Sequence, residues 1–135
     1  MAVFLNNGVQ VTVNSVALTD HVTSVTLNRT FDELEVTAMG DSGHKFVKGL
    51  EASSVTIDFL NDTATGEVLQ TLQAAWGTSV TVLIKQTSAA VSATNPSYTM
   101  SCLINNTTDV NGSVADLGTQ SVTWTVNGAI AVATA

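Results

Sequence analysis

Residues 38–49, AMGDSGHKFVKG, hold the side chains of this chain that are most able to do chemistry. Residues 40–43 spell GDSG, the tetrapeptide that surrounds the nucleophilic serine in one class of serine proteases, and His44 follows directly. Such a serine needs a histidine as general base and an aspartate that orients the histidine. Glycine, aspartate and serine are also the commonest turn-forming residues. The stretch therefore predicts either a catalytic loop or a turn.

The surroundings of Ser42 favour the turn. The chain has only two histidines, His21 and His44, and His44 lies too close to Ser42 in sequence for the usual triad geometry on an extended loop. His-Lys follows GDSG, where trypsin-like proteases have the Gly-Pro that shapes the turn of the oxyanion hole. We therefore expect a protein that is not an enzyme and has no catalytic residues.

The spacing of the side chains also gives no support for metal or cofactor binding. Asp41 and His44 could supply two metal ligands, but His21 and Cys102 have no companions at the spacing of a metal site. The chain contains no glycine-rich phosphate loop and no dinucleotide-binding motif. We expect neither a metal nor a cofactor.

Three carboxylates, those of Asp32, Glu33 and Glu35, are expected at a turn and at the start of a strand. No aromatic pocket surrounds them in the sequence, so they do not predict a pair of catalytic carboxylates. A solvated acidic edge that discourages sideways aggregation is the better interpretation.

Cys102 is the only cysteine, so an intrachain disulfide is excluded. It lies on the apolar register of residues 97–105, which predicts a small buried core residue. The chain shows no charged-then-apolar leader and no apolar run of membrane-spanning length. We therefore expect a protein that is made inside the cell and does not enter a membrane.

The composition is that of a β protein with few charges. Hydrophobic residues make up 44% of the 135 residues and charged residues only 11%, and the net charge is −7. The abundant valine and threonine favour strands. Surfaces of serine, threonine and asparagine are easily dehydrated, which favours burial against copies of the same chain. A neutral, hydroxyl-coated β domain is the plainer alternative. Four basic residues cannot form the basic stripe of a nucleic-acid reader.

Alternation of polar and apolar residues predicts the strands. We expect two strands around the hairpin pair Asn7-Gly8, two more around a turn at residues 30–32, and four later ones; the eight segments are residues 2–5, 9–13, 21–29, 33–39, 53–61, 79–86, 97–105 and 120–128. Residues 38–53 contain too many glycines for a strand and are expected to form a long charged loop. Most charged residues lie between Arg29 and Glu67.

One helix is expected over residues 65–76. Its apolar residues recur on one stripe, which comprises Val68, Leu69, Leu72, Ala75 and Trp76. Thr63 or Thr65 could cap its start, and Gly77 is a natural stop. The stripe must be buried against the sheet, so Trp76, together with Trp124 and Phe59 on apolar strand faces, is expected in the core.

These elements predict one domain over residues 1–135. About seven strands with a period of two and one flanking helix are typical of a mostly-β sandwich or closed barrel.

The chain resembles the small tail tube proteins of long-tailed bacteriophages over nearly its whole length. The resemblance rests on VTLNRTFDELEVTAMGDSGHKFVKGLEASSVTIDFLND, then the helix GEVLQTLQAAWG, then VTVLIK, NPSYTMSCLI and VNGSVADLGTQSVTWTVNG. It implies a β-sandwich with one helix, six copies of which close into a ring. Rings stack into the virion tail tube, which is assembled in the host cytoplasm with other tail proteins. Genomic DNA passes through the lumen without specific binding, and an acidic excess suits such a duct.

The resemblance also implies that the long loop contacts the neighbouring ring. In this chain that loop offers Asp41, His44, Lys45, Phe46, Lys48 and Glu51. Lys45 and Lys48 are a basic pair in an acidic chain, so we expect acidic partners on a neighbour, with Asp32, Glu33 and Glu35 as candidates. We expect the loop to be mobile in a free subunit and ordered when a second ring docks.

Two other classes of protein stay open. A capsid decoration or tail-terminator protein would share the fold but would form discrete oligomers. A carbohydrate-binding or adhesin β-sandwich would require a row of exposed aromatics, which this chain can hardly provide, since Phe59, Trp76 and Trp124 are expected in the core.

Overall fold

The computed structural model describes residues 8–135, so the strand expected at residues 2–5 and Asn7 of the expected hairpin pair lie outside the described residues. The fold is mostly β with one short helix. The elements run in the order β1 (Gln10–Val13), β2 (Val16–Ala17), η1 (Thr19–His21), β3 (Val22–Asn28), β4 (Phe31–Glu35), β5 (Phe46–Glu51), β6 (Ser54–Leu60), α1 (Val68–Ala75), β7 (Ser79–Lys85), β8 (Ser97–Leu103) and β9 (Thr119–Ala133).

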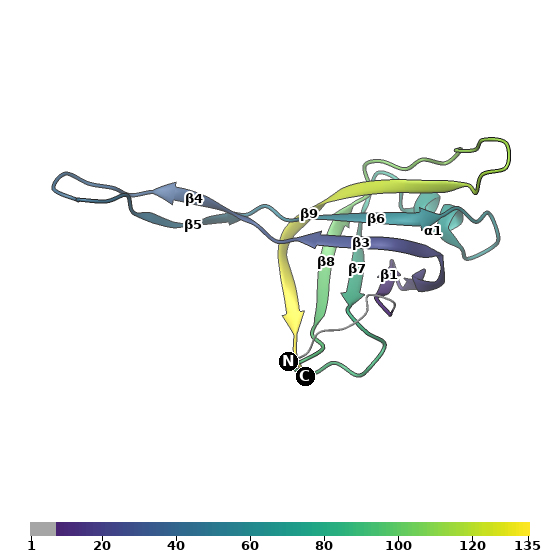
Figure 1. Cartoon of the computed structure of the whole chain (residues 1–135), viewed down its shortest axis with the longest axis horizontal. Coiled ribbons are helices and arrows are strands. Elements are labelled where there is room, and N and C mark those ends of the chain that lie inside the picture. Colours follow the sequence, from purple (N-terminus) through teal and green to yellow (C-terminus); the bar gives the residue numbers. More distant parts are fainter. Residues whose placement is uncertain (1–7) are drawn as a thin grey trace.

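Seven strands form one antiparallel sheet in the order β2-β1-β7-β8-β9-β6-β3. The sheet curves around its own inner face as a half-barrel, as Figure 1 shows. This confirms the expected mostly-β fold with one helix. The curved sheet leaves two edges in the described chain, at β2 and at β3, because neither strand has a partner on its outer side.

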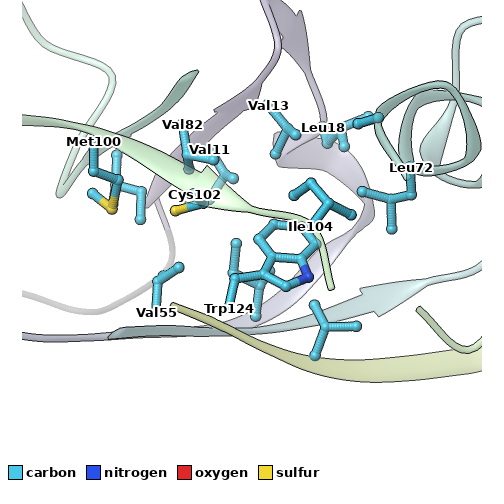
Figure 2. Close-up of a cluster of buried hydrophobic side chains, with 14 of the residues drawn as sticks. Val11, Val13, Leu18, Val55, Leu72, Val82, Met100, Cys102, Ile104 and Trp124 are labelled. Carbon is cyan, nitrogen blue, oxygen red and sulfur yellow. The ribbon is translucent and has the colours of Figure 1, made fainter. Parts of the chain in front are cut away.

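The core lies on the inner face of this half-barrel. Alternate residues of β6 and β9 point inward, and Val55, Phe59 and Trp124 have no exposed surface. The Phe59 and Trp124 rings lie 6.2 Å apart, and the indole N–H of Trp124 donates to the carbonyl of Asn106 at 3.1 Å. Figure 2 shows Trp124 among the buried aliphatic side chains. The expected core positions of Phe59 and Trp124 are thus confirmed.

Cys102 is also buried, as expected, and Figure 2 places its sulfur inside the same cluster. Burial raises the pKa of its thiol to about 12. At neutral pH the side chain is therefore a protonated, apolar thiol that has little nucleophilic character.

Helix α1 covers the inner face with Val68, Leu72 and Ala75, all fully or almost fully buried. The expectation for Trp76 was wrong, because 57% of this residue is exposed. The helix ends at Ala75, and Trp76 has an extended backbone (φ −52°, ψ 126°), which turns its side chain off the apolar stripe. Gly77 follows with φ +76°, a left-handed conformation that glycine adopts at helix ends.

The start of α1 also differs from the prediction. The residue before the helix is Glu67, and no side chain caps the first turn, so neither Thr63 nor Thr65 acts as a cap. The preceding segment is instead a turn, in which the Asp62 carboxylate accepts from the backbone N–H of Ala64 at 2.8 Å. Gly66, with φ +79°, lets the chain enter the helix from this turn.

The chain does not reverse at residues 30–32, contrary to the prediction. Strand β3 pairs with β6, whereas β4 pairs with β5, so the chain runs straight on from one sheet into the other. The reversal comes only between β4 and β5. Residues 46–51 of the expected loop form strand β5 despite Gly49. Residues 31–51 thus form a two-stranded ribbon, called the arm below, which Figure 1 shows projecting away from the half-barrel.

The base of the arm is closed by hydrogen bonds between the two residues that flank it. The backbone N–H of Ala52 donates to the carbonyl of Thr30 at 2.7 Å, and the Thr30 hydroxyl donates to the carbonyl of Ala52. These bonds continue the β3–β6 ladder to the foot of the arm.

Among residues 8–135, no helix has the length and apolar character needed to cross a membrane.

Candidate assembly surface

The GDSG stretch forms the turn at the tip of the arm. The Asp41 carboxylate accepts from the backbone N–H of Ala38 at 2.8 Å, and the Asp41 N–H donates to the Ala38 carbonyl at 3.1 Å. Gly40 has φ +89°, which the turn requires of glycine. The nearby His44 ring bonds to the Glu35 carboxylate. Asp41 thus stabilises the turn, and His44 forms a pair with Glu35 across the two strands of the arm.

The basic side chains of the arm have partners within the same arm. Lys45 Nζ lies 3.0 Å from an Asp41 carboxylate oxygen. Lys48 lies opposite Glu33 in the β4–β5 register, and its ammonium is 5.8 Å from the centre of the Phe31 ring. Both lysines therefore have contacts within their own arm, so their charges do not by themselves require acidic partners on a neighbour.

The electrostatics of the tip reflect these pairs. The backbone N–H of Ala38, followed by Lys45, lowers the pKa of Asp41 below its usual value. The His44 ring, followed by the Thr37 hydroxyl, lowers the pKa of Glu35. Both carboxylates are therefore ionised at neutral pH and contribute to the acidic character of the arm.

Glu51 anchors the arm to the half-barrel. Its carboxylate accepts from the backbone N–H of Ile130 at 2.9 Å and from the hydroxyl of Ser53 at 3.1 Å. The bond from Ile130 is the main reason that the pKa of Glu51 lies below its usual value. Among the predicted contact residues, Glu51 thus has a structural position at the base of the arm.

One face of the arm carries a row of apolar side chains. Leu34 lies directly opposite Val47 in the ladder, and directly opposite residues project to the same face. Val36, two residues beyond Leu34, shares that face. Leu34, Val36 and Val47 are 53%, 48% and 47% exposed. We call these three residues the apolar strip. Phe46 lies on the opposite face, across from Glu35, and is 53% exposed.

The arm exposes many large apolar side chains to water. Besides the strip, its exposed large apolar side chains are Phe31, Met39, Phe46 and Leu50. Within the described part of the chain, no third strand pairs with β4 or β5. Isolated two-stranded hairpins are at best marginally stable, and large exposed apolar patches mark interaction sites. The arm is therefore the candidate functional site of the described chain.

A groove of about 620 Å³ lies at the open seam of the half-barrel, beside the unpaired edge of β3. Its lining belongs to the rim of the core, because most of its apolar residues also pack against buried core side chains. The apolar lining consists of Val9, Val22, Val25, Leu27, Ile84 and Tyr98, and the single charged residue is Arg29.

The fold brings carboxylates to His21 that sequence spacing did not predict. The ring Nε2 lies 2.8 Å from Asp62, and Nδ1 lies 2.9 Å from Asp20 and 3.3 Å from Glu67. The expectation that His21 has no companions at the spacing of a metal site was wrong, because the fold brings Glu67 beside Asp20 and His21, with one ligand atom of each within 4.8 Å of the others. The hydrogen bond that the His21 ring donates to the Asp20 carboxylate is the largest cause of the raised pKa of His21, which burial partly opposes.

A second surface is the outer face of strands β3, β6 and β9, which we call the hydroxyl face. The residues that project outward there are Ser24, Thr26, Asn28, Ser54, Thr56, Asp58, Ser121, Thr123 and Thr125. The Thr56 and Thr123 hydroxyls are hydrogen-bonded at 3.0 Å. Asp58 is the only ionisable residue in this set.

No protein-family model matches the chain, and no curated protein matches it.

Proposed function

We propose that this chain is a structural protein that assembles with copies of itself, forming six-membered rings that stack into the tail tube of a long-tailed bacteriophage. The observation that carries the proposal is the arm, a projecting ribbon with an exposed apolar strip that no other part of residues 8–135 covers. The resemblance of the sequence to tail tube proteins supplies the kind of assembly.

Contacts between unlike surfaces build rings or filaments. If the arm of one copy binds a different surface of the next copy, the contact is heterologous, and repetition closes a ring or extends a filament. The unpaired edges at β2 and β3 favour the same outcome, because exposed strand edges promote aggregation unless a neighbour covers them.

The hydroxyl face suits a surface between subunits or along a duct. Hydroxyl groups lose water at lower cost than ions do, so such a face can be buried against a neighbour. Nothing on it would hold phosphates, since its one ionisable residue is the acidic Asp58. A wall of this chemistry lets DNA pass without binding it, and the net charge of −7 acts in the same direction.

Removal of the arm tests the proposal. Residues 31–51 are replaced by Asn-Gly, a two-residue hairpin turn, between Thr30 and Ala52, whose hydrogen bonds already close the base. We expect this arm-less variant to keep the far-ultraviolet spectrum of a β protein and to stay monomeric at concentrations where the wild type forms rings and filaments in negative-stain micrographs. The two readouts separate loss of assembly from loss of folding.

A matched control removes apolar surface elsewhere. Val110 and Val114 lie in the loop before β9 and are 92% and 99% exposed. The variant Val110→Ser with Val114→Ser should assemble like the wild type. A folded arm-less variant that still forms filaments would refute the proposal, and discrete oligomers of the wild type without filaments would favour a decoration or terminator protein instead.

A further inference from the structure

We propose that the groove at the seam of one copy receives the arm of a second copy, so that the arm completes the half-barrel of its neighbour. This inference rests on the proposed self-assembly and adds the docking surface to it.

The groove is an unfinished part of the core. Val22, Val25 and Leu27 of β3 pack against buried core residues from one side and line the groove on the other. Ile84 and Tyr98 line it from β7 and β8. Apolar side chains that continue a core to the surface gain most when a partner removes them from water.

The arm has the matching chemistry. Its apolar strip of Leu34, Val36 and Val47 is half exposed, and its strands have free outer edges. Strand β3 also has a free edge beside the groove. A ribbon laid along β3 can therefore add backbone hydrogen bonds while its strip enters the groove, which is the usual mode of recognition by strand addition.

Charge favours the same partner. Among the residues that the structure describes, Arg29 is the only charged one that lines the groove. The exposed Asp32 lies two residues before Leu34, on the face of the apolar strip, whereas Glu33 projects from the other face. Residues 31–51 carry five acidic and two basic side chains in all. An acidic ribbon is thus electrostatically suited to a groove with one guanidinium at its rim.

Within residues 8–135, the chain's own arm does not reach the groove. None of the residues that line the groove belongs to the arm of the same chain, and Figure 1 shows that arm extending away from the half-barrel. The arm and the groove are different surfaces, so their pairing is heterologous and repeats from copy to copy.

The test blocks the groove after folding. The only native thiol, Cys102, is buried and has a raised pKa of about 12, so a thiol introduced by Leu27→Cys is the only reactive one among residues 8–135. The folded Leu27→Cys subunit is labelled with a bulky maleimide. We expect the labelled subunit to remain folded and to stop assembling, whereas labelled Val114→Cys, which is fully exposed elsewhere, assembles normally.

A mixing experiment then identifies the occupant. The arm-less variant has an open groove and no arm, and the labelled Leu27→Cys variant has an arm and a blocked groove. Neither should assemble by itself, and together they should form a one-to-one complex with a mass of two subunits. In a separate experiment, an arm-less Leu27→Cys subunit should react with maleimide at least tenfold more slowly when the already labelled, arm-bearing variant is present.

Each other outcome overturns a defined part of the account. If labelled Leu27→Cys assembles while the arm-less variant does not, the arm binds another surface and only the groove is wrong. If the thiol at position 27 is unreactive in the arm-less subunit, the groove is already covered by its own chain and the inference fails. If the arm-less variant assembles, the proposed function fails as well.

Discussion

Two tryptophans test the assignment of the core residue by residue. Trp124 is completely buried, whereas Trp76 is 57% exposed. Trp124→Ala should therefore lower the free energy of unfolding by about 3–5 kcal/mol, the usual cost of removing a buried large side chain. Trp76→Ala, the matched control, should lower it by less than about 1 kcal/mol. Denaturant unfolding of both variants measures the difference, and equal losses would show that the core is assigned wrongly.

His21 should make stability depend on pH. Its pKa is raised above the ordinary 6.5, chiefly by Asp20, so its stabilising contribution is present below pH 6.5 and is lost as pH rises through the higher folded value. The pKa of Asp62 is lowered from 3.8, first by the N–H of Ala64 and then by His21, so its contribution is lost only as pH falls below that value. Stability from this pair is therefore greatest between these two ordinary pKa values.

The melting temperature of the wild type should consequently fall between pH 5 and pH 8 by more than that of His21→Asn. The asparagine keeps a polar side chain at this position but cannot carry the charge. Identical pH profiles for the two proteins would contradict the assignment of the effect to His21.

At the scale of the element, Gly49 allows the two strands of the arm to approach each other closely, because it has no side chain. A Cβ atom at this position would lie 2.7 Å from the backbone carbonyl oxygen of Asp32, which is closer than real contacts allow. Gly49→Ala should therefore disturb the pairing of β4 with β5 and reduce assembly. The half-barrel does not depend on this contact, so its melting temperature should change little.

Gly43→Ala is the matched control, because a Cβ atom there meets no atom within 4 Å and the residue has no positive φ. Amide hydrogen exchange over residues 31–51 reports on the arm directly. Faster exchange in Gly49→Ala than in Gly43→Ala is the expected result, and equal protection of the arm in the two variants would contradict it.

The sequence predicted those elements whose pattern is local. Alternation along β6 and β9 correctly placed Phe59 and Trp124 in the core, and the helical stripe correctly placed Leu72. Trp76 was misplaced because the helix ends one residue earlier, which depends on the packing of the following turn.

The arm and the His21 cluster could not be predicted in the same way. Turn-forming residues at 30–32 do not reveal whether the chain reverses there or passes into a second sheet, since both choices satisfy the alternation of the flanking strands. Two of the three carboxylate partners of His21, Asp62 and Glu67, lie 41 and 46 positions away in sequence, so only the folded chain brings them to the ring.

At the scale of the whole molecule, the half-barrel and the arm have opposite properties. The half-barrel buries one continuous core and presents a hydroxyl face with a single ionisable residue, whereas the arm buries little and carries much of the charge. Under the proposed assembly, such a subunit would gain stability when its arm binds a neighbour, and the same contact would cover the open seam.

The measurement that tests this account most directly is the mass of the purified protein over a wide range of concentration, by mass photometry together with negative-stain microscopy. The account predicts a six-subunit ring that gives way to hollow filaments as concentration rises, and a monomer at every concentration for the arm-less variant. A wild-type protein that stays monomeric throughout, also when seeded with phage tail components, would contradict it.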